Sequence, residues 1–434
     1  MNENKKTASD KRLLIETDRL ILRLPSANDA GSLFSILGDA ETIKYMSMDP
    51  FESEEFVAEC IGRWASRENK AMDFVYTVVE KDSGEIVGMI NTCGLHNSDP
   101  TIGYCLNKKF WGKGYATETL RAFNEFLFEQ GYDTLVIDAV DENIGSNLVI
   151  RKCGFGYIGS SMEVLSDGKP DPVKIMEYRM LRPSKQIDDL RDVEEKLQLL
   201  LGEKEAFSPS LQRYKDSELS DMYDLNQFVY SAMPSRDEIK SAIDYQKNKG
   251  DHFIKLEGRF ALSKKLIDEF NLEECDELSM LLTVGNPKDW TINTNVEVKN
   301  LCDDFSIEND LVQLEMKEFG NVYGKDFTER KILHWIEKAK EDNGLNFYAA
   351  YLDGKIAGSL YTFKSGDYLL IDALVVDSDQ RKKYVATTLL ANAIENEGGR
   401  AFLHADPDDT PKEMYVKMGF RLADCKYGYL NNEI

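Results

Sequence analysis

A glycine-containing turn at residues 110–118 joins a strand-like run at 102–106 to an amphipathic helix. The turn holds Gly112 and Gly114, and the helix carries Leu120 and Phe123 on one face. Backbone N–H groups at a helix N-terminus lack intrahelical partners, and the helix dipole favours negative charge there. Because glycine has no Cβ, the backbone can approach a bulky phosphate closely. The segment therefore predicts a pyrophosphate-binding loop.

Two common phosphate-binding motifs do not fit this turn. The sequence holds no G-x-x-x-x-G-K-[ST], and the two glycines lack the third one of a dinucleotide fingerprint. Residues 111–116 fit instead the acetyl-CoA loop of the GNAT N-acetyltransferases, Q/R-x-x-G-x-G/A, with Trp111 in the Q/R position. Further segments follow the order of that family over about residues 12–182, namely 16–23, 84–88, 102–104 and Asn143-x-x-Ser146 with 151–155. The chain thus resembles the GNAT branch that includes the ribosomal-protein N-terminal acetyltransferases.

The resemblance implies an α/β fold (mixed α+β), with a twisted mixed sheet flanked by helices and acetyl-CoA as the acyl donor. It also implies direct transfer of the acetyl group to a primary amine, with a protein or peptide N-terminus as the favoured acceptor. A small amine, such as an aminoglycoside or a polyamine, is the alternative. An α-amino group has a pKa of about 7.7–8.0, against about 10.4 for lysine, so a peptide N-terminus needs only a weak base.

The resemblance also assigns residues. The implied donor-binding residues are Tyr104, Cys105, Leu106, Trp111, Gly112, Lys113, Gly114, Tyr115, Ala116 and Asn143. Ser146 is the implied acid for the CoA thiolate, since Ile150 stands where many relatives have a tyrosine. Glu163 is the candidate base, because it shares a strand face with the family's base position two residues later. The structural alternatives are a helix N-cap for Asn143 and Ser146, and solvated surface positions for Lys113 and Glu163.

A second copy follows at an offset of 270 residues, where the segment 84–88 returns at 354–358. The expected donor-binding residues of this copy are Leu374, Val375, Val376, Arg381, Lys382, Lys383 and Ala386. Tyr415 is its candidate acid, with a packed core tyrosine as the alternative. Tyr384 stands where a glycine is expected, so phosphate binding would depend on side-chain charge. The other interpretation is a non-catalytic acyl-CoA-binding or scaffolding module.

The repeat predicts three parts: residues 1–185 as a GNAT domain, 186–292 between the copies, and 293–434 as a second GNAT-like domain. Leu190, Val193, Leu197 and Leu201 recur at helical spacing, which predicts a linker helix. The remainder of 186–292 is interpreted as a degenerate partial GNAT-like module, with an unrelated helical insert as the alternative.

Composition limits the partners, cofactors and cellular compartment that this chain is expected to have. The net charge of −24 argues against duplex nucleic acid as a general partner and against anionic membranes. No run approaches the roughly 18 apolar residues of a membrane span, and the first residues lack a secretory signal. The seven cysteines and four histidines are scattered and form no metal motif, so no metal is expected. Free cysteines and the absence of a signal predict a cytoplasmic protein.

Overall fold

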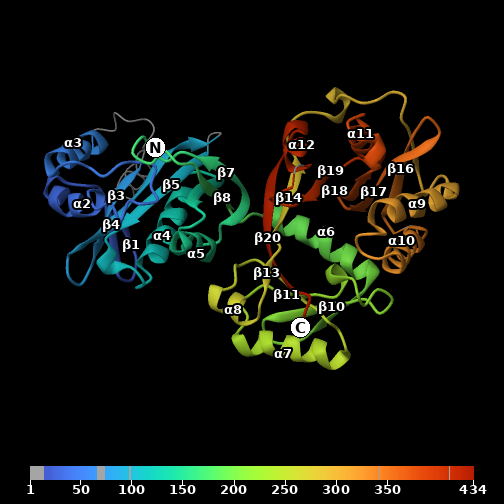
Figure 1. Ribbon diagram of the computed structural model, residues 1–434, viewed down its shortest axis with the longest axis horizontal. Helices are drawn as coiled ribbons and strands as arrows, with labels where there is room; N and C mark the ends of the chain where they lie inside the picture. Colours follow the sequence, from blue (N-terminus) through green and yellow to red (C-terminus); the bar gives the residue numbers. More distant parts are fainter. Residues whose placement is uncertain (1–13, 66–73, 97–98, 342, 410) are drawn as a thin grey trace, which may run out of the picture. The chain divides into compact units, whose positions relative to one another are not determined.

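The computed structural model describes residues 14–65, 74–96, 99–341, 343–409 and 411–434. The chain forms two compact units, one of residues 1–182 with 261–264 and one of residues 183–260 with 265–434. Each unit is built on a β-sheet flanked by helices (Figure 1), which confirms the predicted fold class. Within the described ranges, no helix is long and apolar enough to cross a membrane.

The first unit contains a sheet of eight strands in the order β1-β2-β3-β4-β5-β6-β8-β7. Neighbouring strands are antiparallel except for β5 and β6, which are parallel and are connected through helix α4. The elements are β1 (Leu14–Glu16), β2 (Leu20–Arg23), α2 (Ala30–Leu37), α3 (Glu54–Ala65), β3 (Val75–Glu80), β4 (Ile86–His96), β5 (Asp99–Leu106), α4 (Tyr115–Glu129), β6 (Thr134–Val140), α5 (Ile144–Lys152), β7 (Gly156–Glu163) and β8 (Val173–Leu181).

Helices cover both faces of this sheet. Successive side chains of a strand point to opposite faces, so neighbouring residues of β5 pack against different helices. On one face, Cys105 packs in a cluster with residues of α2 and α3. On the other, Leu106 packs with Leu120 and Phe123 of α4, both fully buried. Burial of each such side chain stabilises the fold by about 1.5–3 kcal/mol. The apolar face predicted for the helix after the glycine turn is thus the face that fixes α4 on the sheet.

Strands β5 and β6 diverge after a short paired stretch. Their ladder holds only two pairs, Thr101 with Val136 and Ile102 with Ile137. Beyond it, β5 continues to Leu106 paired with β4, and β6 continues to Val140 paired with β8. Each strand therefore presents an edge of backbone N–H and C=O groups to the opening between them.

The second unit contains a sheet of twelve strands, in the order β15-β16-β17-β18-β19-β14-β20-β12-β11-β10-β9, with β13 also paired to β20. The elements are α6 (Lys185–Leu201), β9 (Glu203–Ala206), β10 (Leu211–Lys215), β11 (Phe228–Tyr230), α7 (Arg236–Lys249), β12 (Ile254–Gly258), α8 (Lys264–Glu269), β13 (Glu273–Glu274), β14 (Glu277–Leu282), β15 (Glu297–Asn300), α9 (Glu308–Phe319), α10 (Lys325–Ala339), β16 (Leu345–Leu352), β17 (Lys355–Ser365), β18 (Tyr368–Val376), α11 (Val385–Glu397), β19 (Arg400–Ala405), α12 (Pro411–Met418) and β20 (Phe420–Asn431).

The segment 186–292 shares this sheet with residues 293–434. Strand β14 lies between β19 and β20, and β20 pairs with β14 through its first half and with β12 through its second. In the first unit the corresponding place beside β6 is taken by β8, which follows β7 in the chain. In the second unit it is taken by β14, which precedes the whole C-terminal copy. Completion of the C-terminal sheet thus depends on the segment between the copies.

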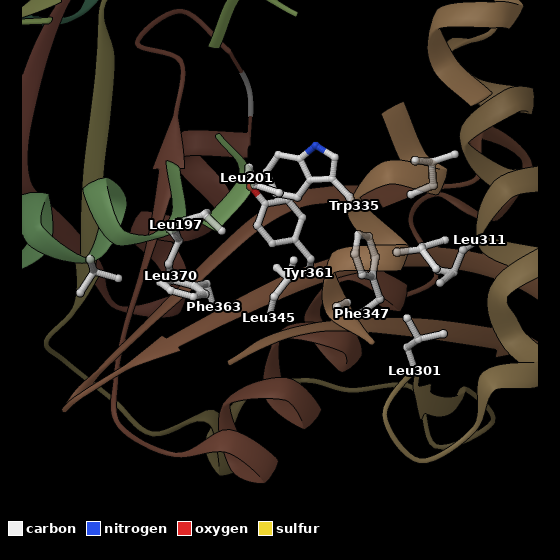
Figure 2. Packing of buried hydrophobic residues seen from close by; sticks show 14 of the residues in the cluster. Leu197, Leu201, Leu301, Leu311, Trp335, Leu345, Phe347, Tyr361, Phe363 and Leu370 are labelled. Carbon is white, nitrogen blue, oxygen red and sulfur yellow. The ribbon is translucent and has the colours of Figure 1, made fainter. Parts of the chain in front are cut away.

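The core of the second unit lies between the sheet and helices α6, α9 and α10. Leu197 and Leu201 of α6 pack with Trp335 of α10 and with Phe347 and Tyr361 of the sheet (Figure 2). Helix α11 packs against β17 and β18. Strands β18 and β19 also diverge, because their ladder ends at Ile371 with Leu403 while β18 continues to Val376. Both units therefore contain a parallel strand pair that opens at one end.

Candidate functional site

The predicted phosphate loop lies directly after strand β5, between a short 3-10 helix at 108–110 and the start of α4. Gly112 and Gly114 have φ angles of 73° and 82°, a left-handed conformation that side chains disfavour. A Cβ on Gly112 would meet no atom of the protein within 4 Å, so this glycine serves backbone conformation and not internal space. The loop ends at the N-terminus of a helix with free N–H groups. These features fit a pyrophosphate.

Arg19 holds this loop in place. Its guanidinium pairs with Glu118 in the first turn of α4 at 2.6 and 2.7 Å, and it donates a 3.0 Å hydrogen bond to the carbonyl of Lys113. The guanidinium also lies 4.4 Å from the centre of the Tyr115 ring. Thr17 Oγ1 donates a second side-chain hydrogen bond to Glu118. The segment 16–23, which carried the family resemblance without a role, therefore fastens the N-terminal strands to the loop.

Of the other loop residues, Trp111 and Tyr115 form hydrogen bonds within the unit, Lys113 is exposed, and Ala116 is partly buried. Trp111 is half exposed, and its Nε1 donates a 2.8 Å hydrogen bond to the carbonyl of Leu106 at the end of β5. Tyr115 is buried and donates a hydrogen bond to Glu80. Lys113 is exposed, with its ammonium 5.2 Å from the Phe110 ring. Ala116 is partly buried in the first turn of α4.

Tyr104 on β5 and Ser146 in the first turn of α5 are in contact. Their hydroxyl oxygens share a hydrogen bond of 3.0 Å, and burial raises the pKa of Tyr104 to about 12. Asn143 is the N-cap of α5, and its side-chain oxygen accepts a 3.2 Å hydrogen bond from the backbone N–H of Ser146. The cap orients the turn that carries Ser146. The sequence indicated both hydroxyl residues, but not that they form a pair.

The two cysteines near the opening are poor nucleophiles. Cys105 and Cys153 are buried, and burial raises the pKa of their thiols to about 12 and about 11. At neutral pH both are therefore thiols, whereas nucleophilic attack needs a thiolate.

Asp138 is a candidate base that the sequence reasoning did not identify. It is the first residue of β6 beyond the paired stretch, and it lies directly opposite Glu177 of β8. Burial, followed by the carboxylates of Glu177 and Glu163, raises the pKa of Asp138 to about 6, although the residue remains accessible to solvent. Glu163 itself is exposed at the end of β7 and accepts a hydrogen bond from Ser161. Only the strand register reveals Asp138, because no local motif surrounds it.

The loop of the second unit keeps the backbone shape of the first without its glycines. Lys382 and Tyr384 have φ angles of 63° and 59°, at the positions of Gly112 and Gly114. A left-handed conformation costs a non-glycine residue about 1–2 kcal/mol. The Tyr384 side chain is 55% exposed. The strained conformation is therefore maintained by contacts elsewhere in the loop.

Those contacts repeat the pattern of the first unit with different residues. Asn293 donates a hydrogen bond to the carbonyl of Lys383, as Arg19 does to that of Lys113, and its backbone N–H bonds Thr388 Oγ1, at the position of Glu118. Arg381 takes the place of Trp111 and makes a long contact of 3.5 Å to the carbonyl of Val376. Both loops are thus fixed at the same two carbonyls.

The remaining residues expected in the second unit lie around this loop. Arg381 also pairs with Glu318, and Lys383 donates to Gln380. The other donor-binding candidates are partly or fully buried, except for the exposed Lys382; they are Leu374, Val375 and Val376 on β18 and Ala386 in α11. Tyr415 on α12 is buried against Phe420, and burial, Asp372 and Asp409 raise its pKa to about 12. Among the described residues, no group of three or more His, Cys, Asp or Glu side chains forms a metal site.

A parallel strand pair that opens beside a pyrophosphate-type loop is the arrangement expected of an acyltransferase that uses a CoA thioester. Residues 19–156 match the family model described as acetyltransferase (GNAT) domain, and residues 308–420 match that of the acetyltransferase (GNAT) family. Together the matches span more than half of the chain. The chain belongs to the GNAT acetyltransferases and carries two such domains in tandem, as the repeat predicted.

The comparisons also identified individual similar proteins. The chain is 27% identical over 133 residues to the uncharacterized N-acetyltransferase p20 of Bacillus licheniformis, a match that covers 30% of this chain and 71% of p20. It is 25% identical over 174 residues to the uncharacterized N-acetyltransferase YoaA of Bacillus subtilis, a match that covers 39% of this chain and 97% of YoaA. A solved structure of a functionally unknown conserved protein from Staphylococcus epidermidis is 18% identical to this chain. The match covers 54% of this chain and 95% of that protein, with a TM-score of 0.48.

Proposed function

We propose that the N-terminal unit transfers acetyl from acetyl-CoA directly to a primary amine, with the N-terminus of a protein or peptide as the favoured acceptor. The observation that motivates this proposal is the opening between β5 and β6, since Tyr104 and Asp138 lie on these two strands beyond their paired stretch and the glycine loop directly follows β5. An extended pantetheine chain fits such a gap because it can bond to the strand edges.

The residues around the gap divide the chemistry among them. The amine nitrogen attacks the thioester carbonyl, a C–N bond forms, and the C–S bond breaks. An N–H group of β5 polarises the carbonyl oxygen. Asp138, with Glu163 as the second candidate, accepts the proton that the amine loses. Ser146, hydrogen-bonded to Tyr104, delivers a proton to the thiolate that leaves.

The basicity of Asp138 favours an α-amino acceptor over a lysine side chain. Its pKa of about 6 lies roughly two units below that of an α-amino group and more than four below that of lysine. Such a base can draw the proton from an amine that is already partly neutral at pH 7, but is too weak to deprotonate lysine efficiently. A small amine, such as an aminoglycoside or a polyamine, stays the alternative acceptor.

We further propose that the C-terminal domain binds acyl-CoA, whether or not it is catalytic. The loop keeps the left-handed conformation at Lys382 and Tyr384 despite its energetic cost, which supports this role.

Release of thiol from acetyl-CoA by the full-length protein tests the proposal. The acceptors are peptides with a free N-terminus, the same peptides with a blocked N-terminus and one lysine, and polyamines. We expect release with the first class, loss of that activity in Gly114→Trp, and its retention in Tyr415→Phe. Release that survives Gly114→Trp and is lost in Tyr415→Phe would assign the activity to the C-terminal domain.

A further inference from the structure

A cavity of about 320 Å³ lies inside the second unit, on the face of its sheet that α6, α9 and α10 cover. Its apolar wall is formed by Leu197, Leu201, Trp335 and Tyr361 (Figure 2). The segment between the two copies contributes α6 and β12 to the wall, and β18 and β19 contribute Asp372 and His404 at the point where they diverge. The volume lies at the lower end of the range for small-molecule sites.

Charged side chains meet at one end of this cavity. His404 Nε2 lies 2.7 Å from Glu194 of α6, and its Nδ1 lies 3.8 Å from both Glu277 and Asp372. Lys426 of β20 pairs with Glu194 and with Glu277. Burial lowers the pKa of His404, but the carboxylates of Glu277, Glu194 and Asp372 raise it to about 10. The imidazole is therefore a cation at neutral pH and belongs to a paired network.

Three residues that line the cavity each have a buried polar atom without a hydrogen-bond partner among the described residues. The atoms are Glu315 Oε2 on α9, Gln227 Oε1 before β11, and Trp335 Nε1 on α10. Their residues are 4%, 1% and 7% exposed. The nearest cation to Glu315 Oε2 is Lys331 Nζ at 3.9 Å, beyond hydrogen-bond distance. An unpaired buried polar group costs about 1–3 kcal/mol, so three around one cavity call for an explanation.

The residues that line the cavity include more carboxyl groups than cationic groups. Six carboxyl groups line the cavity, those of Glu194, Asp224, Glu257, Glu277, Glu315 and Asp372. Four cationic groups face them, those of Lys255, Lys331, His404 and Lys426. Burial raises the pKa of Glu257 and of Glu315, and the nearby lysines lower it only in part. A ligand that brings positive charge would stabilise both groups as carboxylates.

We infer that this cavity is a binding site for a small amine that also carries hydroxyl groups. The ammonium group supplies charge and donors to Glu315 Oε2, while a hydroxyl group donates to Gln227 Oε1 and accepts from Trp335 Nε1. The methylene groups of the ligand pack on Trp335 and Tyr361, a suitable surface for a cation as well.

The site also gives the segment between the copies a role beyond completing the sheet. Glu194, Lys255, Glu257 and Gln227 all come from residues 186–292 and form the walls that select the ligand. Because Asp372 and His404 line the cavity at the point where β18 and β19 diverge, the cavity reaches the opening of the C-terminal domain. Use of the bound amine as an acetyl acceptor rests on the acyl-CoA binding proposed above for the C-terminal domain. Binding of the amine to the cavity does not depend on that proposal.

Isothermal titration of the full-length protein without acetyl-CoA tests the site independently of any transferase activity. The ligands are ethanolamine, 2-amino-1,3-propanediol and D-glucosamine, and the matched neutral controls are ethylene glycol, glycerol and D-glucose. We expect at least one amine to bind and its neutral match not to bind.

Two variants on different helices then locate the ligand. Glu315→Gln removes the charge, and Trp335→Phe removes the N–H donor while the ring remains; each should weaken binding about tenfold. Glu308→Gln is the control, since Glu308 lies in the first turn of the same helix α9, pairs with Lys340 and does not line the cavity. The melting temperature of each variant without ligand verifies its folding.

The inference is overturned if none of the amines binds at 10 mM, or if a neutral control binds as tightly as its amine. It is equally overturned if an amine binds with unchanged affinity to both folded variants, because the ligand would then lie elsewhere.

Discussion

Replacement of Arg19 by alanine should raise the KM of the N-terminal domain for acetyl-CoA about tenfold while kcat stays nearly unchanged. Arg19 contacts no reacting group, but its guanidinium joins Glu118, the carbonyl of Lys113 and the ring of Tyr115. Without these contacts the loop of Gly112 and Gly114 must be ordered by the ligand, at the expense of binding free energy.

The magnitude follows from the exposure of the contacts. The side chain of Arg19 is 46% exposed and that of Glu118 is 18% exposed, so solvent screens the ion pair to about 0.5–1 kcal/mol. The contact with the Tyr115 ring adds about 0.5–1 kcal/mol at such a site. The sum of about 1.4 kcal/mol corresponds to a factor of ten in affinity.

Initial rates of thiol release over a range of acetyl-CoA concentrations measure the effect. Lys240→Ala is the matched control, because Lys240 forms an exposed ion pair with Asp244 at 2.7 Å on α7, in the other unit. A KM within twofold of the parent protein, in a folded Arg19→Ala variant, would refute the role assigned to this residue.

Three further outcomes are expected. Ser146→Ala should lower kcat about 100-fold, and addition of Tyr104→Phe should lower it little further, because the two hydroxyls act through one hydrogen bond. The value of kcat/KM should fall about tenfold per pH unit below the pKa of the acceptor amine, about 7.7–8.0, and about 100-fold per unit below pH 6, since the amine must be neutral and Asp138, whose raised pKa is about 6, must be ionised; Asp138→Asn should leave only the tenfold dependence. Arg191→Ala should lower the free energy of unfolding of the second unit by about 3 kcal/mol in urea denaturation. Arg191 pairs with the largely buried Asp424 at 2.5 and 2.8 Å, and the variant leaves this carboxylate without its cation. Equal stability of that variant and the parent would contradict this account.

The sequence identified the family and the two loops because these features are local. The turn with Gly112 and Gly114, the apolar face of α4 and the N-cap Asn143 are each encoded within a few residues. The repeat at an offset of 270 residues located the second loop, with Tyr384 where a glycine is expected. It could not predict that Lys382 and Tyr384 would adopt the left-handed conformation, because Asn293, which bonds to the carbonyl of Lys383 and to Thr388, is about 90 residues away in sequence.

The strand partners of the segment between the copies were likewise decided by the tertiary structure. From the sequence alone, residues 186–292 were interpreted as a linker helix followed by a partial module. The pairing of β14 with both β19 and β20 makes that segment part of the C-terminal sheet. Strand pairing over more than a hundred residues depends on which edge is free in the folded chain, and no periodicity records this.

What the sequence determined by itself is the class of the protein, the existence of two domains and the position of the loops before α4 and α11, since turn glycines, helix caps and apolar periodicity act over short distances. What only the tertiary structure decided is the chemistry around those loops: the pairing of Tyr104 with Ser146, the raised pKa of Asp138, and the charged cavity around His404 and Glu315. The reason is that hydrogen-bond partners, burial and pKa depend on side chains that long-range strand pairing brings together.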